Sequence, residues 1–277
     1  MDLTSVIAED VARALAEDIG TGDVTACLVP AAARAQAHVV TREAAVLCGM
    51  DWFEACFHQI DRDTRIRWKA RDGDRLAAGQ IVCELTGRAR GLLSAERTSL
   101  NFLQTLSAVS TATRAFVDAV AGTRAAILDT RKTIPGLRSA FKYAVRSAGG
   151  TNHRMGLYDA VLIKENHIAA AGGIAAAMSQ ARAMAPDIPT QIEVENLAQL
   201  EQAIACGAKL ILLDNFDLPR LRAAVKLTAN RAVLEASGGV TLQSVRAIAE
   251  TGVDRISVGS LTKDVRAVDF SMRFAPG

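Results

Sequence analysis

Six short apolar runs that alternate with helix-like segments constrain the fold of this chain more than any other feature. The runs cover residues 125–133, 160–167, 191–196, 210–216, 232–239 and 255–262. The segments between them have helical spacing, and two of these open with residues typical of helix starts, Pro135 and Thr241. Apolar strands that alternate with helices are typical of parallel βαβ units. The second half of the chain is therefore predicted to be an α/β structure with a parallel sheet.

The polar ends of these runs favour a barrel over an open sheet. In a βα barrel the carboxyl ends of all strands converge on one face, where active sites lie. In an open doubly wound sheet, only the strands at the switch point need such groups. One or two polar strand ends are ordinary in any α/β protein, whereas six in succession favour the barrel. The polar groups at these ends are Arg131, Lys132, Lys164, Glu193, Glu195, Asp214, Ser237 and Ser260.

The first 120 residues have a different pattern. Strand-like pieces such as "TRIRWKA" and "QIVCELTG" are followed by a long helical stretch with Leu100, Leu103 and Leu106 near helical spacing. We predict an N-terminal α+β domain over residues 1–120 and a barrel domain over 121–263. Residues 264–277 do not complete another βα unit, and we expect them to pack back on the first domain.

Composition and charge exclude several classes of protein. The 32 basic and 30 acidic residues nearly balance, and aromatic residues make up 4% of the chain, which argues against a nucleic-acid partner. No run approaches the roughly 18 apolar residues of a membrane span. The N-terminus lacks the basic region of a signal peptide. The five scattered cysteines are expected to be reduced and mostly buried, in a cytoplasmic protein.

Positive charge is concentrated in one window of the chain. Residues 131–167 contain seven Lys and Arg against two Asp and Glu, a net +5, so the rest of the +2 chain sums to −3. Arg131, Lys132 and Lys164 are at strand ends, and "GGTNHR" adds His153 and Arg154 between them. Such cations repel one another unless anions bind, so we expect a multiply anionic ligand. Arg138, Lys142 and Arg146 share a helix face, and they are as consistent with a solvated surface stripe as with an anion-binding role.

The later strands carry groups suited to phosphate and ribose. Ser237 with two following glycines, and Gly259 with Ser260, each precede a helix start, where backbone N–H groups favour phosphate. Glu193 and Asp214 are predicted to contact ribose hydroxyls, Mg²⁺ or a developing positive charge. The alternative is that they only form ion pairs with nearby Lys and Arg.

With these residues identified, nearly the whole chain resembles the quinolinate phosphoribosyltransferase family. The segments that carry the resemblance include "SAERTSLNFLQTLS", "DTRKTIPGLR", "GGTNHRMGLYDAVLIKENH", "EVEN", "LLDNF", "EASGG" and "VGSLT". The resemblance implies an N-terminal α+β open sandwich domain followed by an incomplete parallel α/β barrel. It also implies a reaction of quinolinate with 5-phosphoribosyl 1-pyrophosphate (PRPP) that gives nicotinate mononucleotide, pyrophosphate and CO₂ in de novo NAD biosynthesis.

The resemblance also implies roles for individual residues. It assigns the quinolinate carboxylates to Arg131, His153, Arg154, Lys164 and an arginine donated by a neighbouring subunit, Arg97. It assigns PRPP to Thr130, Lys132, Glu193, Asp214, Ser237, Gly238, Gly239, Gly259 and Ser260. Within these sets the catalytic residues are Lys132, Lys164, Glu193 and Asp214, with Glu193 preferred to Glu195. The implied assembly is a homodimer or a hexamer, with Mg²⁺ carried by PRPP near Glu193 and Asp214 and no dedicated metal site.

Three other functions remain open from the sequence. A paralogue of the same fold, found with molybdenum transport genes, would act on another acid. A Schiff-base aldolase or decarboxylase would use Lys164 as its nucleophile. A catalytically silent anion-binding protein would bind the same ligands and release no CO₂.

Overall fold

The computed structural model describes residues 3–275, and its helices and strands form two compact units. Residues 1–2 and 276–277, at the ends of the predicted N-terminal domain and C-terminal segment, lie outside the described residues. The first unit comprises the chain up to Arg114, Thr133–Gly149 and the chain from Thr262 onwards. The second comprises Ala115–Lys132 and Gly150–Leu261.

The first unit is a mixed α/β structure built on an antiparallel sheet. Its four strands are β12 (Phe270–Phe274), β1 (Arg34–Thr41), β5 (Ile81–Arg88) and β3 (Arg65–Trp68), in that order. The two short strands β2 (Ala45–Val46) and β4 (Arg75–Leu76) form a separate pair. The C-terminal residues therefore extend this sheet, because β12 pairs with β1 from Ala37 to Thr41.

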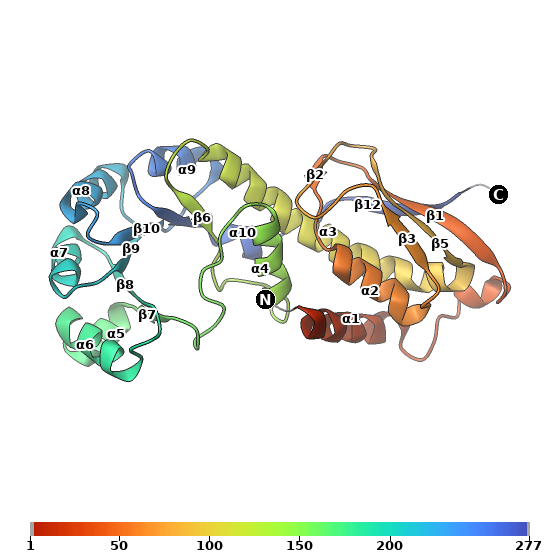
Figure 1. Ribbon diagram of the computed structural model, residues 1–277, viewed down its shortest axis with the longest axis horizontal. Coiled ribbons are helices and arrows are strands. Elements are labelled where there is room, and N and C mark those ends of the chain that lie inside the picture. The colour runs from red at the N-terminus through yellow and green to blue at the C-terminus, as the bar shows by residue number, and fades with distance from the viewer. Residues whose placement is uncertain (1–2, 276–277) are drawn as a thin grey trace. The chain divides into compact units, whose positions relative to one another are not determined.

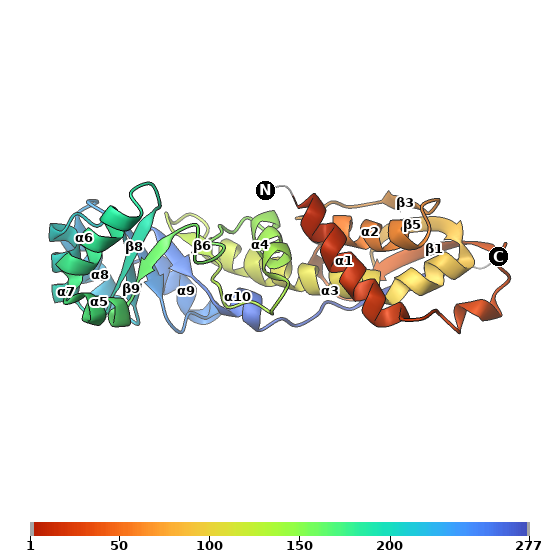
Figure 2. The ribbon, with the colours of Figure 1, turned by 90° about the horizontal axis from the view of Figure 1, so that it is seen from below.

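Helices cover this sheet and supply its core. The helices are α1 (Thr4–Ile19), α2 (Met50–Ile60) and the start of α3 (Ala89–Ala119), with a 3₁₀ turn at Ala26–Leu28 (Figure 1). Phe53 and Phe57 of α2 are fully buried, with Leu85 of β5 and Leu103 of α3 in the same apolar cluster. Helix α1 packs on α2, as the view from below shows (Figure 2). The long helix predicted before residue 120 is confirmed as α3.

The segment after Pro135 belongs to the first unit, although the sequence-based boundary placed it in the barrel domain. It forms α4 (Arg138–Ser147), and Phe141 lies in one buried cluster with Trp52 and Leu106. The hydroxyl of Tyr143 donates a hydrogen bond of 2.7 Å to Asp72. The apolar face of α4 therefore packs against residues that are distant in sequence.

Two details of α4 differ from the prediction. The helix begins at Arg138 and not at Pro135, because Gly136 turns the chain with φ +83° just before it. Lys142 is 0% exposed, so the stripe of Arg138, Lys142 and Arg146 is not a solvated face. Arg146 alone of the three is exposed.

Truncating Phe141 tests the packing of α4 on the first unit. We expect Phe141→Ala to lower the free energy of unfolding by about 3–5 kcal/mol, because it opens a cavity in a fully buried cluster. Denaturant unfolding followed by circular dichroism measures this change. Leu28→Ala, at a side chain that is 84% exposed, is the matched control and should change it by about 0.5 kcal/mol or less. A Phe141→Ala protein as stable as the control would contradict this packing.

The second unit is an incomplete parallel barrel. Its strands are β6 (Ala126–Leu128), β7 (Val161–Ile163), β8 (Thr190–Val194), β9 (Leu210–Asp214), β10 (Val233–Ser237) and β11 (Arg255–Ser257). The sheet order is β6-β11-β10-β9-β8-β7, and every ladder is parallel. Each of the six predicted strands is confirmed. Among the described residues β6 and β7 do not pair, which leaves the barrel open on one side.

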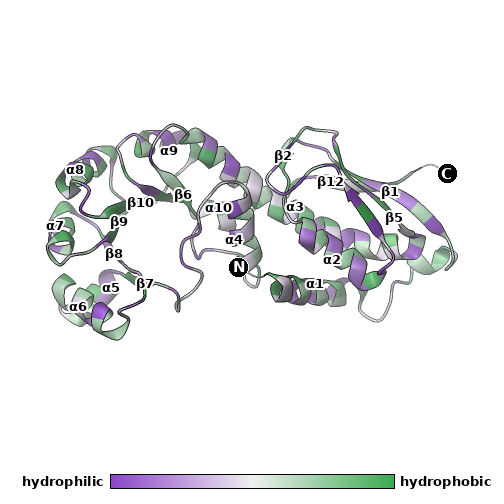
Figure 3. Ribbon diagram, viewed as in Figure 1, coloured by the Kyte–Doolittle hydropathy of each residue, from purple (hydrophilic) through white to green (hydrophobic). Residues whose placement is uncertain are grey.

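Helices follow the strands of this barrel from β7 onwards, whereas β6 is followed by α4 of the first unit. They are α5 (Glu165–Ala171), α6 (Ile174–Met184), α7 (Leu197–Ala205), α8 (Leu218–Thr228), α9 (Leu242–Ala249) and α10 (Ser260–Lys263). Helices α5 to α9 lie on the outer side of the curved sheet (Figure 1) and carry both hydrophobic and hydrophilic residues (Figure 3). Side-chain caps start three of them, at Asn196, Asp217 and Thr241. The predicted N-cap role of Thr241 is confirmed.

All five cysteines are free, and Cys48, Cys56 and Cys83 are buried. Burial raises the pKa of the Cys56 thiol to about 12, so it stays protonated and unreactive. Over residues 3–275 the structure contains no helix long and apolar enough to span a membrane.

Candidate functional site

The strand-end residues singled out in the sequence lie at the carboxyl edge of the second unit's sheet. In the strand register Ser237 is opposite Asp214, and Ile163 is opposite Ile192, so Lys164 follows β7 beside Glu193. Gly259 and Ser260 follow β11, whose neighbour β6 leads to Thr130 and Arg131. Because all strands are parallel, their end groups lie at the same edge of the sheet.

Residues 129–132 turn away from β6, and the side chains of Asp129 and Thr130 form hydrogen bonds with the backbone nearby. Asp129 is fully buried, and its carboxylate accepts a hydrogen bond of 2.8 Å from the His153 backbone N–H. The Thr130 hydroxyl accepts from the Lys132 N–H at 3.0 Å, which tightens the turn. A Cβ added to Gly259 would lie 3.3 Å from Cδ of Lys132. The Lys132 side chain therefore passes against Gly259, where only a glycine leaves full room.

The "GGTNHR" segment is attached to the open edge of β6. Thr151 forms an isolated parallel bridge with Leu128: its N–H donates to Ile127, and its carbonyl accepts from Asp129. This short extension of the sheet brings His153 and Arg154 to the same edge as Arg131. The sequence placed these residues between two strand ends, and the bridge explains how they reach them.

Arg154 lies close enough to Arg131 at this edge for their charges to interact. Its guanidinium donates a hydrogen bond of 3.0 Å to the Ala160 carbonyl. Burial, and then the positive charge of Arg131, lower the pKa of Arg154, while Asp159 opposes this shift. Burial and the charge of Arg131 therefore both disfavour the protonated form of Arg154, and an anion bound beside it would offset them.

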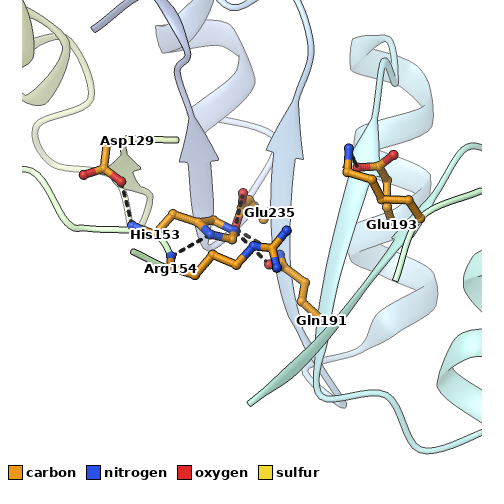
Figure 4. A network of polar contacts seen from close by, with 7 residues as sticks. Asp129, His153, Arg154, Gln191, Glu193 and Glu235 are labelled. Carbon is orange, nitrogen blue, oxygen red and sulfur yellow. Dashed lines mark hydrogen bonds and ion pairs between the residues drawn. The ribbon is translucent and has the colours of Figure 1, made fainter. Parts of the chain in front are cut away.

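His153 joins a polar network inside the barrel (Figure 4). Its Nε2 lies 2.9 Å from Oε1 of Gln191, and its Nδ1 accepts a hydrogen bond of 2.8 Å from the Arg154 N–H. Gln191 in turn donates to Glu235 at 3.0 Å. Gln191 and Glu235 are 6% and 1% exposed, so both side chains are almost completely shielded from solvent.

Carboxylates gather at the ends of β8 and β9. Glu193 forms an ion pair of 3.3 Å with Lys164, whose side chain is 49% exposed against 14% for Glu193. The negative charge of Glu165 is the largest cause of a raised pKa at Glu195, with smaller contributions from Asp214 and Glu193. Asp214 accepts a hydrogen bond from the Asn215 amide at 2.8 Å. The excess negative charge here favours binding of a cation or of hydroxyl donors.

These carboxylates do not form a metal cage. Over the described residues 3–275, no group of three or more His, Cys, Asp or Glu side chains is arranged to hold a metal ion. Mg²⁺ commonly binds through one or two carboxylates together with substrate phosphates, and Glu193 and Asp214 fit that mode.

The loop after β10 combines two glycines of positive φ with the start of a helix. Gly238 and Gly239 have φ of +105° and +60°, and α9 follows with Thr241 as its N-cap. A Cβ at Gly238 would lie 2.1 Å from Oδ1 of Asn215. Asn215 itself has φ +56° and donates its N–H to the Ser237 carbonyl at 2.9 Å. Any side chain at position 238 would therefore disrupt the loop.

Sequence reasoning missed four residues that support this site: Asp129, Gln191, Asn215 and Glu235. Gln191 and Glu235 had a readable signal, since each is two residues before a singled-out residue of its strand, Glu193 or Ser237, and so shares its face. One implied residue is not in this unit: Arg97 lies on α3 in the first unit and is exposed.

Comparisons with known proteins identify relatives along nearly the whole chain. Two family models match: the N-terminal domain of quinolinate phosphoribosyl transferase over residues 21–107, and its C-terminal domain over residues 109–273. The nicotinate-nucleotide pyrophosphorylase (carboxylating) of Mycobacterium leprae is 43% identical over 271 residues, which cover 95% of each chain. The probable enzyme of the same name from Bacillus subtilis is 43% identical over 92% of this chain and 89% of its own.

Solved structures agree with this match. The structure of the nicotinate-nucleotide pyrophosphorylase from Francisella tularensis superposes with a TM-score of 0.96 at 44% identity. The match covers 98% of this chain and 96% of that one. Both the first unit's sheet and the six-stranded parallel sheet are therefore features that solved relatives share.

Proposed function

Because the chain belongs to the quinolinate phosphoribosyl transferase family, we propose that it joins quinolinate to the ribose of PRPP and removes one carboxylate as CO₂. The products are nicotinate mononucleotide and pyrophosphate, in de novo NAD biosynthesis. The observation that carries this proposal is the shared sheet edge: the neighbouring cations Arg131 and Arg154 at one part of it, and the positive-φ glycines Gly238 and Gly239 before α9 at another. Such an edge suits two polyanions held side by side.

Quinolinate, a pyridine dicarboxylate, is proposed to bind near the Arg131 end. Guanidinium groups pair with carboxylates through two parallel hydrogen bonds, and Lys164 adds a point charge from the end of β7, the next strand along the chain. Arg154 and His153 complete the pocket from the segment attached to β6. Burial first, and then the charge of Arg131, lower the pKa of Arg154, and a bound dianion would offset both effects. This charge balance is what a dicarboxylate supplies and a neutral ligand does not.

PRPP is proposed to bind along the later strands. Ser237, Gly238 and Gly239 offer a hydroxyl and backbone N–H groups to the 5′-phosphate, with Gly259 and Ser260 on the adjacent strand end. Lys132, which passes against Gly259, reaches toward the pyrophosphate with Thr130 beside it. Glu193 and Asp214 face the ribose. Mg²⁺ bound with PRPP at these two carboxylates would offset the charge of the leaving pyrophosphate.

Glycosidic bond formation needs stabilisation of positive charge on the ribose. As the bond from C1 to the pyrophosphate oxygen breaks, its electron pair leaves with pyrophosphate and C1 becomes oxocarbenium-like. Glu193 and Asp214 stabilise that charge electrostatically, and Arg131 and Arg154 hold the pyridine so that its nitrogen lone pair attacks C1. Lys132 stabilises the negative charge that develops on the pyrophosphate.

Decarboxylation follows from the same ring chemistry. Once the nitrogen is bonded to C1, the ring is a pyridinium and accepts electrons. The bond to the carboxylate next to the nitrogen then breaks, its electron pair stays on the ring carbon, and a proton takes the place of CO₂. Lys164 and the arginines continue to hold the remaining carboxylate, which is retained in nicotinate mononucleotide.

An assay of product formation distinguishes this function from the other candidates. Purified protein with quinolinate, PRPP and Mg²⁺ should form nicotinate mononucleotide and CO₂ together. Turnover of another acid in place of quinolinate would favour the paralogue, and binding without CO₂ release would favour the silent protein. Borohydride trapping of an adduct on Lys164 would favour the Schiff-base enzyme. The ion pair of Lys164 with Glu193 and its 49% exposure argue against that last function, which needs a desolvated amine.

We further propose a cytoplasmic homodimer, or a hexamer built from three such dimers, in which Arg97 enters the neighbouring subunit's site. The exposure of Arg97 on α3 and the five free cysteines are consistent with this assembly and location.

Mixing two inactive variants tests the donated arginine. Arg97→Ala and Lys164→Ala proteins should each be nearly inactive alone. After they are unfolded together and refolded, hybrid dimers contain one intact site each, so activity should return to about a quarter of the wild-type value by random pairing. If mass spectrometry detects hybrid dimers but activity does not return, Arg97 serves the site of its own subunit.

A further inference from the structure

A buried glutamine and a buried glutamate behind His153 have no role in the chemistry described above. Gln191 lies on β8 and Glu235 on β10, and their side chains meet on the inner face of the barrel (Figure 4). Burial of a carboxylate and an amide is costly unless they form specific hydrogen bonds. Both residues must therefore have a role that depends on their hydrogen bonds and that a pair of apolar residues could not fill.

The carboxylate of Glu235 determines which way the Gln191 amide points. An ionised carboxylate only accepts hydrogen bonds, so the group that Gln191 presents to Glu235 at 3.0 Å has to be its NH₂. The carbonyl oxygen of Gln191 then faces the other way, toward Nε2 of His153 at 2.9 Å. A glutamine at position 235 could donate or accept and would leave both orientations open.

The orientation of Gln191 in turn determines the tautomer of His153. A carbonyl oxygen only accepts, so Nε2 has to carry the ring proton. Nδ1 is then the acceptor, which is what the Arg154 backbone N–H requires at 2.8 Å. The hydrogen bonds therefore all point the same way: the Arg154 N–H donates to His153, His153 donates to Gln191, and Gln191 donates to Glu235.

The second carboxylate oxygen of Glu235 favours the same tautomer of His153. Oε1 is buried and forms no hydrogen bond in the described part of the chain, and it lies 3.7 Å from His153 Nε2. An unsatisfied buried carboxylate oxygen destabilises the fold. Its negative charge beside Nε2 favours a proton on that nitrogen, which gives a reason for its retention.

We propose that Gln191 and Glu235 are positioning residues that hold His153 as its Nε2–H tautomer and so fix the Arg154 main chain at the quinolinate pocket. Neither residue touches a reacting atom. The role at quinolinate rests on the proposed function, whereas the tautomer of His153 does not. The two parts can therefore fail separately.

Selective ¹⁵N labelling of histidine tests the tautomer without any substrate. The chain has only four histidines, so the His153 ring signals can be assigned as those missing from a His153→Asn protein. In the wild type at neutral pH, Nε2 should be protonated and Nδ1 not. A proton on Nδ1, alone or together with one on Nε2, would overturn the proposal.

Kinetics of two variants test the consequence for quinolinate. Glu235→Gln keeps the size of the side chain but loses the fixed direction, and Gln191→Met loses both hydrogen bonds. We expect each to raise KM for quinolinate by about tenfold, the effect of one oriented hydrogen bond. We expect KM for PRPP to stay close to that of the wild type, and the Glu235→Gln ring signals to show a mixture of tautomers.

Matched controls at exposed positions separate positioning from general loss of structure. Glu250→Gln on the surface and Gln202→Met on α7 should leave both KM values unchanged. Thermal unfolding compares the folded fraction of every variant. An unchanged KM for quinolinate in both folded buried variants, or an equal rise in KM for both substrates, would contradict the positioning role.

Discussion

Arg131→Ala is expected to lower kcat/KM for quinolinate by about 10²–10³-fold, because truncating one partner of a desolvated charge pair costs about 2–5 kcal/mol. The residue follows β6 at the open edge of the barrel, and its charge is the second largest cause of the lowered pKa of Arg154. Steady-state kinetics with quinolinate varied at saturating PRPP measure the effect. Arg131→Lys should give an intermediate loss, since lysine keeps the charge but not the two-pronged geometry.

A charge control and the pKa of Arg154 show whether the loss in Arg131→Ala comes from the lost carboxylate contact. Arg222→Ala, at an exposed position of α8, should keep wild-type kinetics and controls for the loss of one positive charge. The pKa of Arg154 should also rise in Arg131→Ala, because the neighbouring charge has been removed. Near-normal turnover of Arg131→Ala with quinolinate would contradict its assignment to a carboxylate.

Glu193→Gln is expected to lower kcat by about 10²–10³-fold with both substrates saturating, since it removes a charge aligned with the developing positive charge at C1. The substitution keeps the side-chain size and leaves Lys164 without its ion-pair partner at 3.3 Å. Single-turnover kinetics isolate the chemical step from product release. Glu201→Gln, on the exposed face of α7, is the matched control and should be unaffected.

Comparison with Glu195 decides between the two glutamates of "EVEN". Glu195 is exposed just beyond β8, and its pKa is raised chiefly by the negative charge of Glu165. Glu195→Gln removes charge from the same group of carboxylates without removing the residue paired to Lys164. We expect a loss of kcat much smaller than that of Glu193→Gln. An equal or larger loss would assign the ribose contact to Glu195.

The parallel sheet could be predicted because its determinants are local. Each strand is a short apolar run bounded by polar residues, and all six observed strands lie within or one residue outside the predicted runs. The direction of parallel strands then places their end groups, including Lys164 and Asp214, at one edge. Neither step depends on long-range packing.

Features that depend on distant partners could not be predicted. The segment after Pro135 reads as a barrel helix, but Phe141 packs with Trp52 and Leu106, which are remote in sequence. Lys142 is spaced like a surface residue and is nevertheless buried. The His153 network joins β8, β10 and the segment over residues 149–154, so its residues are too far apart in the sequence to be recognised as one motif.

Carbon labelling tests the central claim that this chain is a decarboxylating phosphoribosyltransferase. Quinolinate labelled in the carboxylate next to the ring nitrogen is incubated with the protein, PRPP and Mg²⁺. The mechanism predicts one labelled CO₂ and one pyrophosphate for each unlabelled nicotinate mononucleotide, and no CO₂ without PRPP. Label retained in the nucleotide, or CO₂ released in the absence of PRPP, would contradict it.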